Sequence, residues 1–251
     1  MSPRARSRVA AWSSSPRRSR SLPRMNDSVS RETPSPPTGV AAAFGDAWPK
    51  LQRYADLLAD AGVVRGLIGP REVPRLWERH LLNCAQIAPA FDRDARVCDL
   101  GSGAGLPGVV LALARPDLDL TLLEPLLRRT TFLAEVVEEL ALPNVRVVRG
   151  RAEGHVGAGF DAVTARAVAP LDRLARWALP MCRPGGILLA MKGASAASEV
   201  EASGAALAKA GARSTRVREL ALSPRWDPVV AVEIVAGDTV AAGRPKRRRR
   251  S

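Results

Sequence analysis

The sequence predicts an α/β protein with a doubly wound, mainly parallel sheet of seven strands, preceded by N-terminal helices. Two observations support this class. From residue 95 onward, short apolar stretches alternate with stretches of helical periodicity. A glycine-rich turn at 101–108 joins the first apolar stretch to the first of these helices. Right-handed crossovers place the carboxyl ends of the strands at one edge, where such sheets bind ligands.

The elements of this core, 95–236, are assigned in chain order. Seven strands are expected at 95–100, 118–123, 145–148, 160–165, 186–191, 213–220 and 228–236. Helices are expected between them at 107–114, around the stripe Leu133, Val136, Val137 and Leu140, at 171–182 and at 198–210. The Pro-Gly-Gly sequence at 184–186 is expected to form a turn before the fifth strand.

The segment 39–94 is expected to form the N-terminal helices. Leu51, Tyr54, Leu58 and Ala61 recur at helical spacing, and Gly62 is expected to end the first helix. A second helix is expected to begin near Pro74, because proline suits a first helical turn. Its stripe consists of Val73, Leu76, Trp77, His80, Leu81 and Cys84. Together with the core, these helices make one domain at 39–236.

The two ends of the chain carry its net charge. Residues 1–24 contain seven arginines, and residues 244–251 contain six basic residues, with no acidic residue in either stretch. They account for the net charge of +13, so the rest of the chain is formally neutral. The ends 1–38 and 237–251 lack apolar periodicity and are expected to be disordered. Such basic tails add salt-sensitive attraction to RNA but identify no substrate; solvated tails without a role are the alternative.

The cysteines and the apolar stretches indicate the compartment. Cys84, Cys98 and Cys182 are far apart and form no CxxC pair, which favours a reduced protein without structural zinc. No apolar run approaches the roughly 18 residues needed to cross a membrane. No apolar stretch follows the N-terminal arginine pair, so no signal peptide is expected. We therefore expect a cytoplasmic monomer that binds neither metal nor membrane.

The glycine-rich turn predicts a nucleotide-like ligand. Its glycines allow a close approach of the ligand, and the following helix offers free N–H groups. Gly103, Gly105 and Gly108 also fit the dinucleotide pattern GxGxxG. Asp99, two residues before Gly101, favours S-adenosylmethionine instead, because its carboxylate would repel a pyrophosphate but suits a cationic amino group, bound either directly or through water. A dinucleotide, or a turn without ligand, stays as an alternative.

Two further strand ends complete the expected cofactor site, which is that of a class I S-adenosylmethionine-dependent methyltransferase. Glu124 ends the second strand, where a carboxylate can accept hydrogen bonds from both ribose hydroxyls. Ala152 and Glu153 follow the third strand, where the adenine ring is expected.

The motif at 99–108, Asp-Leu-Gly-Ser-Gly-Ala-Gly-Leu-Pro-Gly, closely resembles that of the RsmG (GidB) family. Arg79-His80 upstream, and Arg166 and Lys192-Gly193 downstream, extend the resemblance over about residues 45–236. These bacterial enzymes methylate N7 of a guanine, position 527, in the 530 loop of 16S ribosomal RNA. The resemblance therefore implies S-adenosylmethionine as cofactor and 16S rRNA in the 30S subunit as partner.

The resemblance also implies cofactor-binding residues. They are Gly101, Leu106, Ala152, Glu153 and Arg166, to which the motif itself adds Asp99, Gly103 and Glu124. The chain departs from the family at 66–68, where Gly-Leu-Ile replaces the Asn-Leu-Thr of many members, so polar contacts of that Asn or Thr are in doubt.

The chemistry requires no general base, because guanine N7 carries a lone pair and no proton; the enzyme has to align the reactants and exclude water. No catalytic residue is therefore assigned. His80, Arg79 and Lys192 are the expected substrate-binding residues. A buried interface histidine, a solvated lysine and, for Arg166, a surface arginine are the alternatives. A small-molecule methyltransferase and a non-catalytic RNA-binding protein of the same fold stay open as alternative functions.

Overall fold

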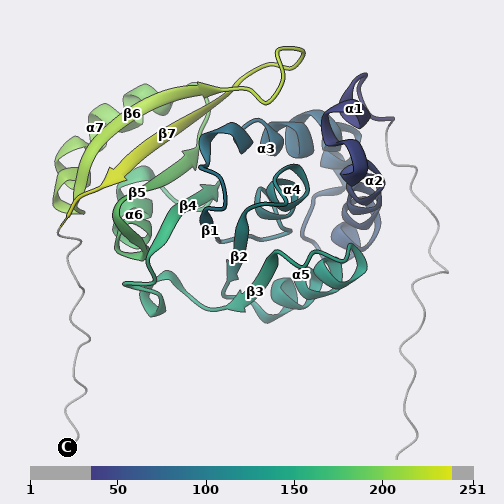
Figure 1. Cartoon of the computed structure of the whole chain (residues 1–251), viewed down its shortest axis with the longest axis horizontal. Coiled ribbons are helices and arrows are strands. Elements are labelled where there is room, and N and C mark those ends of the chain that lie inside the picture. The colour runs from purple at the N-terminus through teal and green to yellow at the C-terminus, as the bar shows by residue number, and fades with distance from the viewer. Residues whose placement is uncertain (1–34, 239–251) are drawn as a thin grey trace, which may run out of the picture. The chain divides into compact units, whose positions relative to one another are not determined.

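The computed structural model describes residues 35–238, which contain a seven-stranded sheet with the strand order β3-β2-β1-β4-β5-β7-β6 (Figure 1). β7 runs antiparallel to both of its neighbours, and the other described pairs are parallel. The strands are β1 (Arg96–Leu100), β2 (Asp119–Glu124), β3 (Val145–Arg149), β4 (Phe160–Arg166), β5 (Cys182–Met191), β6 (Ala212–Leu220) and β7 (Val229–Ala236). The predicted α/β class is confirmed.

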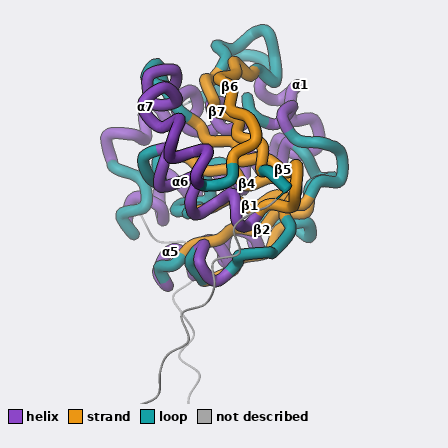
Figure 2. Tube along the Cα trace, turned by 90° about the vertical axis from the view of Figure 1, so that its left-hand side faces the viewer, coloured by secondary structure: helices purple, strands orange, loops and turns teal. Residues whose placement is uncertain are grey.

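Helices cover both faces of the sheet, each over its own hydrophobic core. The N-terminal helices, α4 (Gly108–Ala114) and α5 (Leu127–Glu139) pack on one face. α6 (Leu171–Ala178) and α7 (Ala196–Lys209) pack on the other, as the view from the side shows (Figure 2). Successive strand residues face opposite ways, so Val97 belongs to the first core and Cys98 to the second. The sheet is therefore doubly wound.

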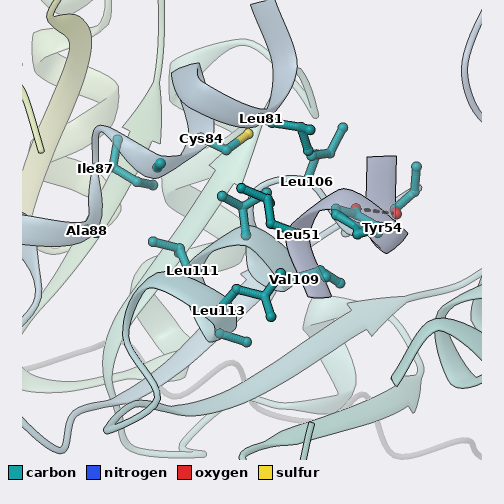
Figure 3. Packing of buried hydrophobic residues seen from close by; sticks show 14 of the residues in the cluster. Leu51, Tyr54, Leu81, Cys84, Ile87, Ala88, Leu106, Val109, Leu111 and Leu113 are labelled. Carbon is teal, nitrogen blue, oxygen red and sulfur yellow. Dashed lines mark hydrogen bonds between the residues drawn. The ribbon is translucent and has the colours of Figure 1, made fainter. Parts of the chain in front are cut away.

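The N-terminal layer is less regular than the core. Its elements are α1 (Val40–Phe44), a 3-10 helix (Gly45–Ala47), α2 (Trp48–Leu57), a π-helical turn (Leu58–Gly62), a second 3-10 helix (Pro70–Arg75), a second π-helical stretch (Leu76–Leu82), α3 (Asn83–Ala85) and a third 3-10 helix (Ala88–Ala90). All six residues of the stripe predicted at 73–84 are buried. Leu81 and Cys84 from this stripe lie close to Leu51 of α2 in the core (Figure 3).

The predicted end of the first helix is close to the observed one, whereas the predicted start of the second is wrong. The π-helical turn ends at Gly62, and two more helical residues follow before the chain turns at Gly66, whose φ is 64°. Glycine adopts this left-handed conformation freely, and the carbonyl of Gly62 accepts hydrogen bonds from the amides of Leu67 and Ile68. The second helix begins at Pro70 rather than near Pro74, because Pro70 already occupies the first-turn position.

The fifth strand starts earlier than expected. β5 begins at Cys182, so the Pro-Gly-Gly sequence at 184–186 is an irregular part of the strand rather than a turn before it. The register with β4 shifts between Phe160 and Ala162. Gly186 allows this close pairing, because a Cβ atom there would lie 2.9 Å from the carbonyl oxygen of Phe160.

No helix in residues 35–238 is long and apolar enough to span a bilayer. Over the same residues, no group of three or more His, Cys, Asp or Glu side chains is placed to hold a metal ion. The expected disorder of 1–38 and 237–251 concerns segments that lie almost wholly outside the described residues.

Candidate functional site

A cavity of about 680 Å³ lies at the carboxyl ends of the central strands. This volume is within the range of small-molecule sites, about 300–1,000 Å³. The strand ends and the N-terminal layer both contribute to its wall. The expected site residues in the wall are Arg79, His80, Gly101, Gly103, Leu106, Glu124, Ala152, Glu153 and Arg166. Asp99 and Lys192 are not in the wall.

The glycine loop, 101–107, depends on backbone shapes that other residues rarely adopt. Gly101 has φ 73°, and a Cβ atom on it would lie 2.9 Å from a methyl group of Val168. Gly105 has φ 101°, and a Cβ atom there would lie 2.6 Å from Val109 and 2.8 Å from the hydroxyl of Tyr54. The glycines therefore allow this loop to pack tightly and leave its cavity side open.

Asp99 lies beneath the loop and is fully buried. Its Oδ2 accepts a hydrogen bond of 3.0 Å from the amide of Gly108, while Oδ1 is buried and has no hydrogen-bond partner among residues 35–238. Burial raises the pKa of Asp99 to about 7. The structure therefore gives no support to a direct contact with the cofactor's amino group, which was one of the two modes expected from the sequence. The side chain instead holds the first turn of α4 from below.

Glu124 holds the loop from the end of β2. Its Oε2 accepts a hydrogen bond of 3.1 Å from the amide of Gly103, and its Oε1 accepts one of 3.0 Å from the amide of Leu126. The guanidinium of Arg129 lies 3.6 Å from the same carboxylate. Each carboxylate oxygen can accept a second hydrogen bond. Glu124 can therefore bind ribose hydroxyls while it keeps the loop in place.

Tyr54 holds the same loop from the opposite side. Its hydroxyl donates a hydrogen bond of 2.8 Å to the carbonyl of Ala104, marked by the dashed line in Figure 3. The ring is fully buried, and burial raises the pKa of Tyr54 well above its usual value, so the hydroxyl stays protonated and donates. The sequence placed Tyr54 on an apolar helix face; the contact of its hydroxyl depends on packing between α2 and the loop.

His80 and Arg166 form a connected group on the cavity wall. Arg166 donates hydrogen bonds to Nδ1 of His80 and to Sγ of Cys84. Since Nδ1 accepts, the proton is on Nε2, which donates to Glu72 at 2.8 Å. Burial lowers the pKa of His80, and the charge of Arg166 acts in the same direction, so the ring is neutral at pH 7. The hydrogen bond from His80 lowers the pKa of Glu72.

This group gives His80 and Arg166 defined positions. His80 is buried and links two segments, as the alternative of an interface histidine supposed, and it also lines the cavity. Glu72 was missed from the sequence, because only the fold brings a residue of the 3-10 helix next to the π-helical stretch. The spacing of eight residues between Glu72 and His80 gives no recognisable pattern.

Arg79 and Lys192, both expected to contact RNA, differ in accessibility. The side chain of Arg79 is 53% exposed, lies 3.4 Å from Glu72 and lines the cavity. The side chain of Lys192 is only 13% exposed and forms an ion pair of 2.7 Å with Glu199. Lys192 is therefore neither a freely solvated lysine nor a side chain open to a phosphate, because its charge is already paired within the chain.

The cavity wall combines apolar and polar parts. Ile68 lines the cavity at the position where many members of the resembling family have threonine, and Leu67 lines it as well, so this part of the wall is apolar. The wall also contains the carboxylate of Glu124 and the pair Ala152-Glu153, which follows β3. These features together fit S-adenosylmethionine: a carboxylate can bind the ribose, an apolar wall can contact the adenine ring, and the glycine loop can hold the amino acid moiety.

The chain matches proteins of one family over most of its length. The family model described as rRNA small subunit methyltransferase G matches residues 47–225. A Ribosomal RNA small subunit methyltransferase G of Nocardioides sp. is 56% identical over 85% of this chain and 86% of that protein. The protein of the same name from Streptomyces coelicolor is 57% identical over 82% of this chain and 88% of that protein.

Solved structures support the fold. The S-adenosylmethionine-dependent methyltransferase SibL matches with a TM-score of 0.53 and 20% identity, over 78% of this chain and 70% of that one. The mitomycin 7-O-methyltransferase MmcR matches with a TM-score of 0.51 and 20% identity, over 78% and 67%. They show the class I methyltransferase fold and nothing of the substrate. On the strength of the sequence matches, the chain belongs to the rRNA small subunit methyltransferase G family and is an enzyme that depends on S-adenosylmethionine.

Proposed function

We propose that this chain methylates N7 of the guanine at position 527, in the 530 loop of 16S rRNA, and that it acts on the assembled 30S subunit as a cytoplasmic monomer. The observation that supports this most directly is the cavity at the strand ends, which combines the cradle for S-adenosylmethionine with the guanidinium groups of Arg79 and Arg166. The family to which the chain belongs provides the class of substrate.

The residues of the cavity have separate tasks in this proposal. Glu124 and Ala152-Glu153 hold the nucleoside part of the cofactor, and Gly101 with Leu106 lets the rest approach the loop backbone. When bound, S-adenosylmethionine supplies an already activated methyl group, which guanine N7 accepts without losing a proton. Arg166, fixed by His80 and Cys84, provides a positive charge beside the reactants. The remaining task is alignment in a site shielded from water.

A reaction without proton transfer agrees with the hydrogen bonds of the histidine in the cavity wall. His80, the histidine of the cavity wall, is tied at both nitrogens by Glu72 and Arg166. A general base would need a free lone pair within reach of the substrate. Neutral His80 has none, so the proposed reaction suits a cavity whose histidine serves to hold an arginine.

The test is methyl transfer from labelled S-adenosylmethionine to undermodified 30S subunits, free 16S rRNA and guanosine. We expect 30S to be a much better substrate than guanosine, because recognition of this kind uses unstacked loop bases together with phosphate contacts. Mapping of the methyl group should place it on N7 of the guanine at position 527. Equal transfer to guanosine, or no transfer to any RNA by protein that binds the cofactor, would overturn the proposal.

A further inference from the structure

A second cavity, of about 550 Å³, lies beside the first. One wall is a polar face of the helical segment 75–86, and the other is the loop between β6 and β7. Arg75, Arg79, Arg225 and Trp226 line it. Because Arg79 lines both cavities, they meet at this side chain.

The loop that forms the outer wall is fixed to the helical segment by Gln86. Its Oε1 accepts a hydrogen bond of 2.7 Å from the amide of Leu222, and its Nε2 donates one of 2.7 Å to the carbonyl of Asp227. Gln86 is 1% exposed. The cavity therefore has a fixed floor, with both ends of the loop tied to the same buried amide.

Two of the three arginines of this cavity, Arg75 and Arg225, are available to an external anion, whereas Arg79 is paired with Glu72. Arg75 and Arg225 are exposed, and within residues 35–238 neither forms an ion pair with a side chain. Glu78 and Asp227 also line the cavity, so the three guanidinium groups leave a net charge of +1. This local excess stands out because the chain between its basic ends is formally neutral.

Trp226 adds an aromatic group to these charges. Its side chain is partly exposed, while its Nε1 is buried with no hydrogen-bond partner in the described part of the chain. An indole ring beside guanidinium groups is the combination with which proteins hold single-stranded nucleic acid: bases stack on the aromatic ring and phosphates pair with the arginines. Acidic peptides use the charges but have no need of the ring.

We propose that this second cavity binds the RNA strand next to the target nucleotide, with phosphates on Arg75 and Arg225 and an unstacked base on Trp226. The proposal rests on the proposed function, because it takes the target guanine to lie in the first cavity. Arg79 then contacts the strand where it passes from one cavity to the other. Binding here holds the substrate in register without touching the cofactor.

The test compares two double variants of the full chain with equal loss of charge. Arg75→Gln/Arg225→Gln changes the second cavity. Arg93→Gln/Arg213→Gln is the control, since both residues are exposed and line neither cavity. Arg93 precedes β1 and Arg213 lies at the start of β6, at the opposite edge of the sheet. RNA affinity over a salt series, cofactor affinity by calorimetry, and KM and kcat for 30S are measured for each.

We expect the Arg75/Arg225 variant to bind RNA at least ten-fold more weakly, with KM raised and kcat and cofactor affinity within two-fold of the wild type. The slope of log K against log salt should fall by roughly 1.4 for two lost single-strand phosphate contacts. Trp226→Leu should weaken RNA binding several-fold and leave that slope unchanged. Unaltered cofactor affinity shows that the variants fold.

The outcomes separate the two proposals. If wild type methylates 30S and the Arg75/Arg225 variant behaves like the Arg93/Arg213 control, the second cavity is not an RNA site and the proposed function stands. A loss confined to kcat or to cofactor affinity would also overturn the inference. No transfer by wild type to any RNA would overturn the proposed function, and this inference with it.

Discussion

Two regions of the molecule hold the same glycine loop in different ways. The sheet holds it from below and from the side: Glu124 accepts a hydrogen bond from the amide of Gly103 in the loop, and Asp99 accepts one from the amide of Gly108, at the start of α4 directly after the loop. The N-terminal layer holds it from the other side, through Tyr54, whose hydroxyl donates to a loop carbonyl. The sheet therefore provides hydrogen-bond acceptors, and the N-terminal layer provides a donor.

The two regions also differ in regularity. The strands of the sheet follow the apolar pattern of the sequence closely, whereas the N-terminal layer contains two π-helical stretches and three 3-10 helices. Irregular helices of this kind are frequent at functional sites. Here the irregular stretch Leu76–Leu82 contains Arg79 and His80, both of which line the cavity. The sheet provides the fixed frame, and the irregular layer provides side chains aimed at the ligand.

The largest expected effect is on the pH dependence of stability, through Asp99 of the sheet. Its pKa of about 7 in the folded chain, against 3.8 when unfolded, means that the folded state retains a proton that the unfolded state loses between pH 4 and 7. Stability therefore falls as the pH rises through this window, by on the order of 4 kcal/mol. Asp99→Asn cannot titrate at this position. Denaturant unfolding from pH 4 to 8 should therefore show that the variant gains stability relative to wild type as the pH rises. Parallel pH profiles would contradict this assignment.

The second effect is on cofactor affinity at Glu124. Glu124→Ala removes an acceptor for the ribose and two backbone hydrogen bonds, one from Gly103 of the loop and one from Leu126 after β2. Charged hydrogen bonds contribute about 1.5–3 kcal/mol each. Calorimetric titration should show binding of S-adenosylmethionine weakened ten-fold or more. Glu135 lies on α5 and forms a surface ion pair with Arg65. The Glu135→Ala variant, which removes this pair, serves as control and should bind S-adenosylmethionine normally. Equal affinity of the two variants would disprove the role of Glu124.

The third effect tests the N-terminal layer, at Tyr54. Tyr54→Phe leaves the buried carbonyl of Ala104 without its donor, at a cost of about 1–2 kcal/mol in unfolding free energy. Cofactor affinity should fall about three- to ten-fold, because the loop loses its hold on one side. Lys50→Met, which removes a bond from the same helix to the carbonyl of Ala141 away from the loop, should leave cofactor affinity unchanged. If both variants bind the cofactor alike, the layer only stabilises the fold.

The smallest effect is expected at Lys192, on the sheet. Its ion pair with Glu199 already uses the charge, and partly exposed pairs contribute about 0–1 kcal/mol. Lys192→Ala should therefore lower methyl transfer to 30S by less than about three-fold and leave cofactor affinity unchanged. A ten-fold loss with a reduced salt slope would show instead that Lys192 leaves Glu199 to contact RNA phosphate.

The comparison also explains which features the sequence could predict. Strand positions followed from apolar alternation, and Glu124 and Ala152 were placed at the cavity because residues at the ends of neighbouring strands meet at one edge. The place of Arg166 in the site was implied by the family resemblance. The contacts of Tyr54 and Glu72 were not predictable, since each depends on how an irregular helix packs against a segment distant in sequence. The pairing of Lys192 was missed for a similar reason: Glu199 lies seven residues away, across the start of α7.

The three buried thiols give each part of this molecule a chemical reporter. Cys84 belongs to the N-terminal layer, Cys98 to β1 and Cys182 to the start of β5. Burial raises the pKa of Cys84 to about 11 and of Cys182 to about 12, and raises that of Cys98 as well. Since the thiolate is the reactive form, the folded chain is inert to electrophiles until a region opens. The order in which the three sulfurs are labelled therefore records the order in which the regions open, with no engineered probe.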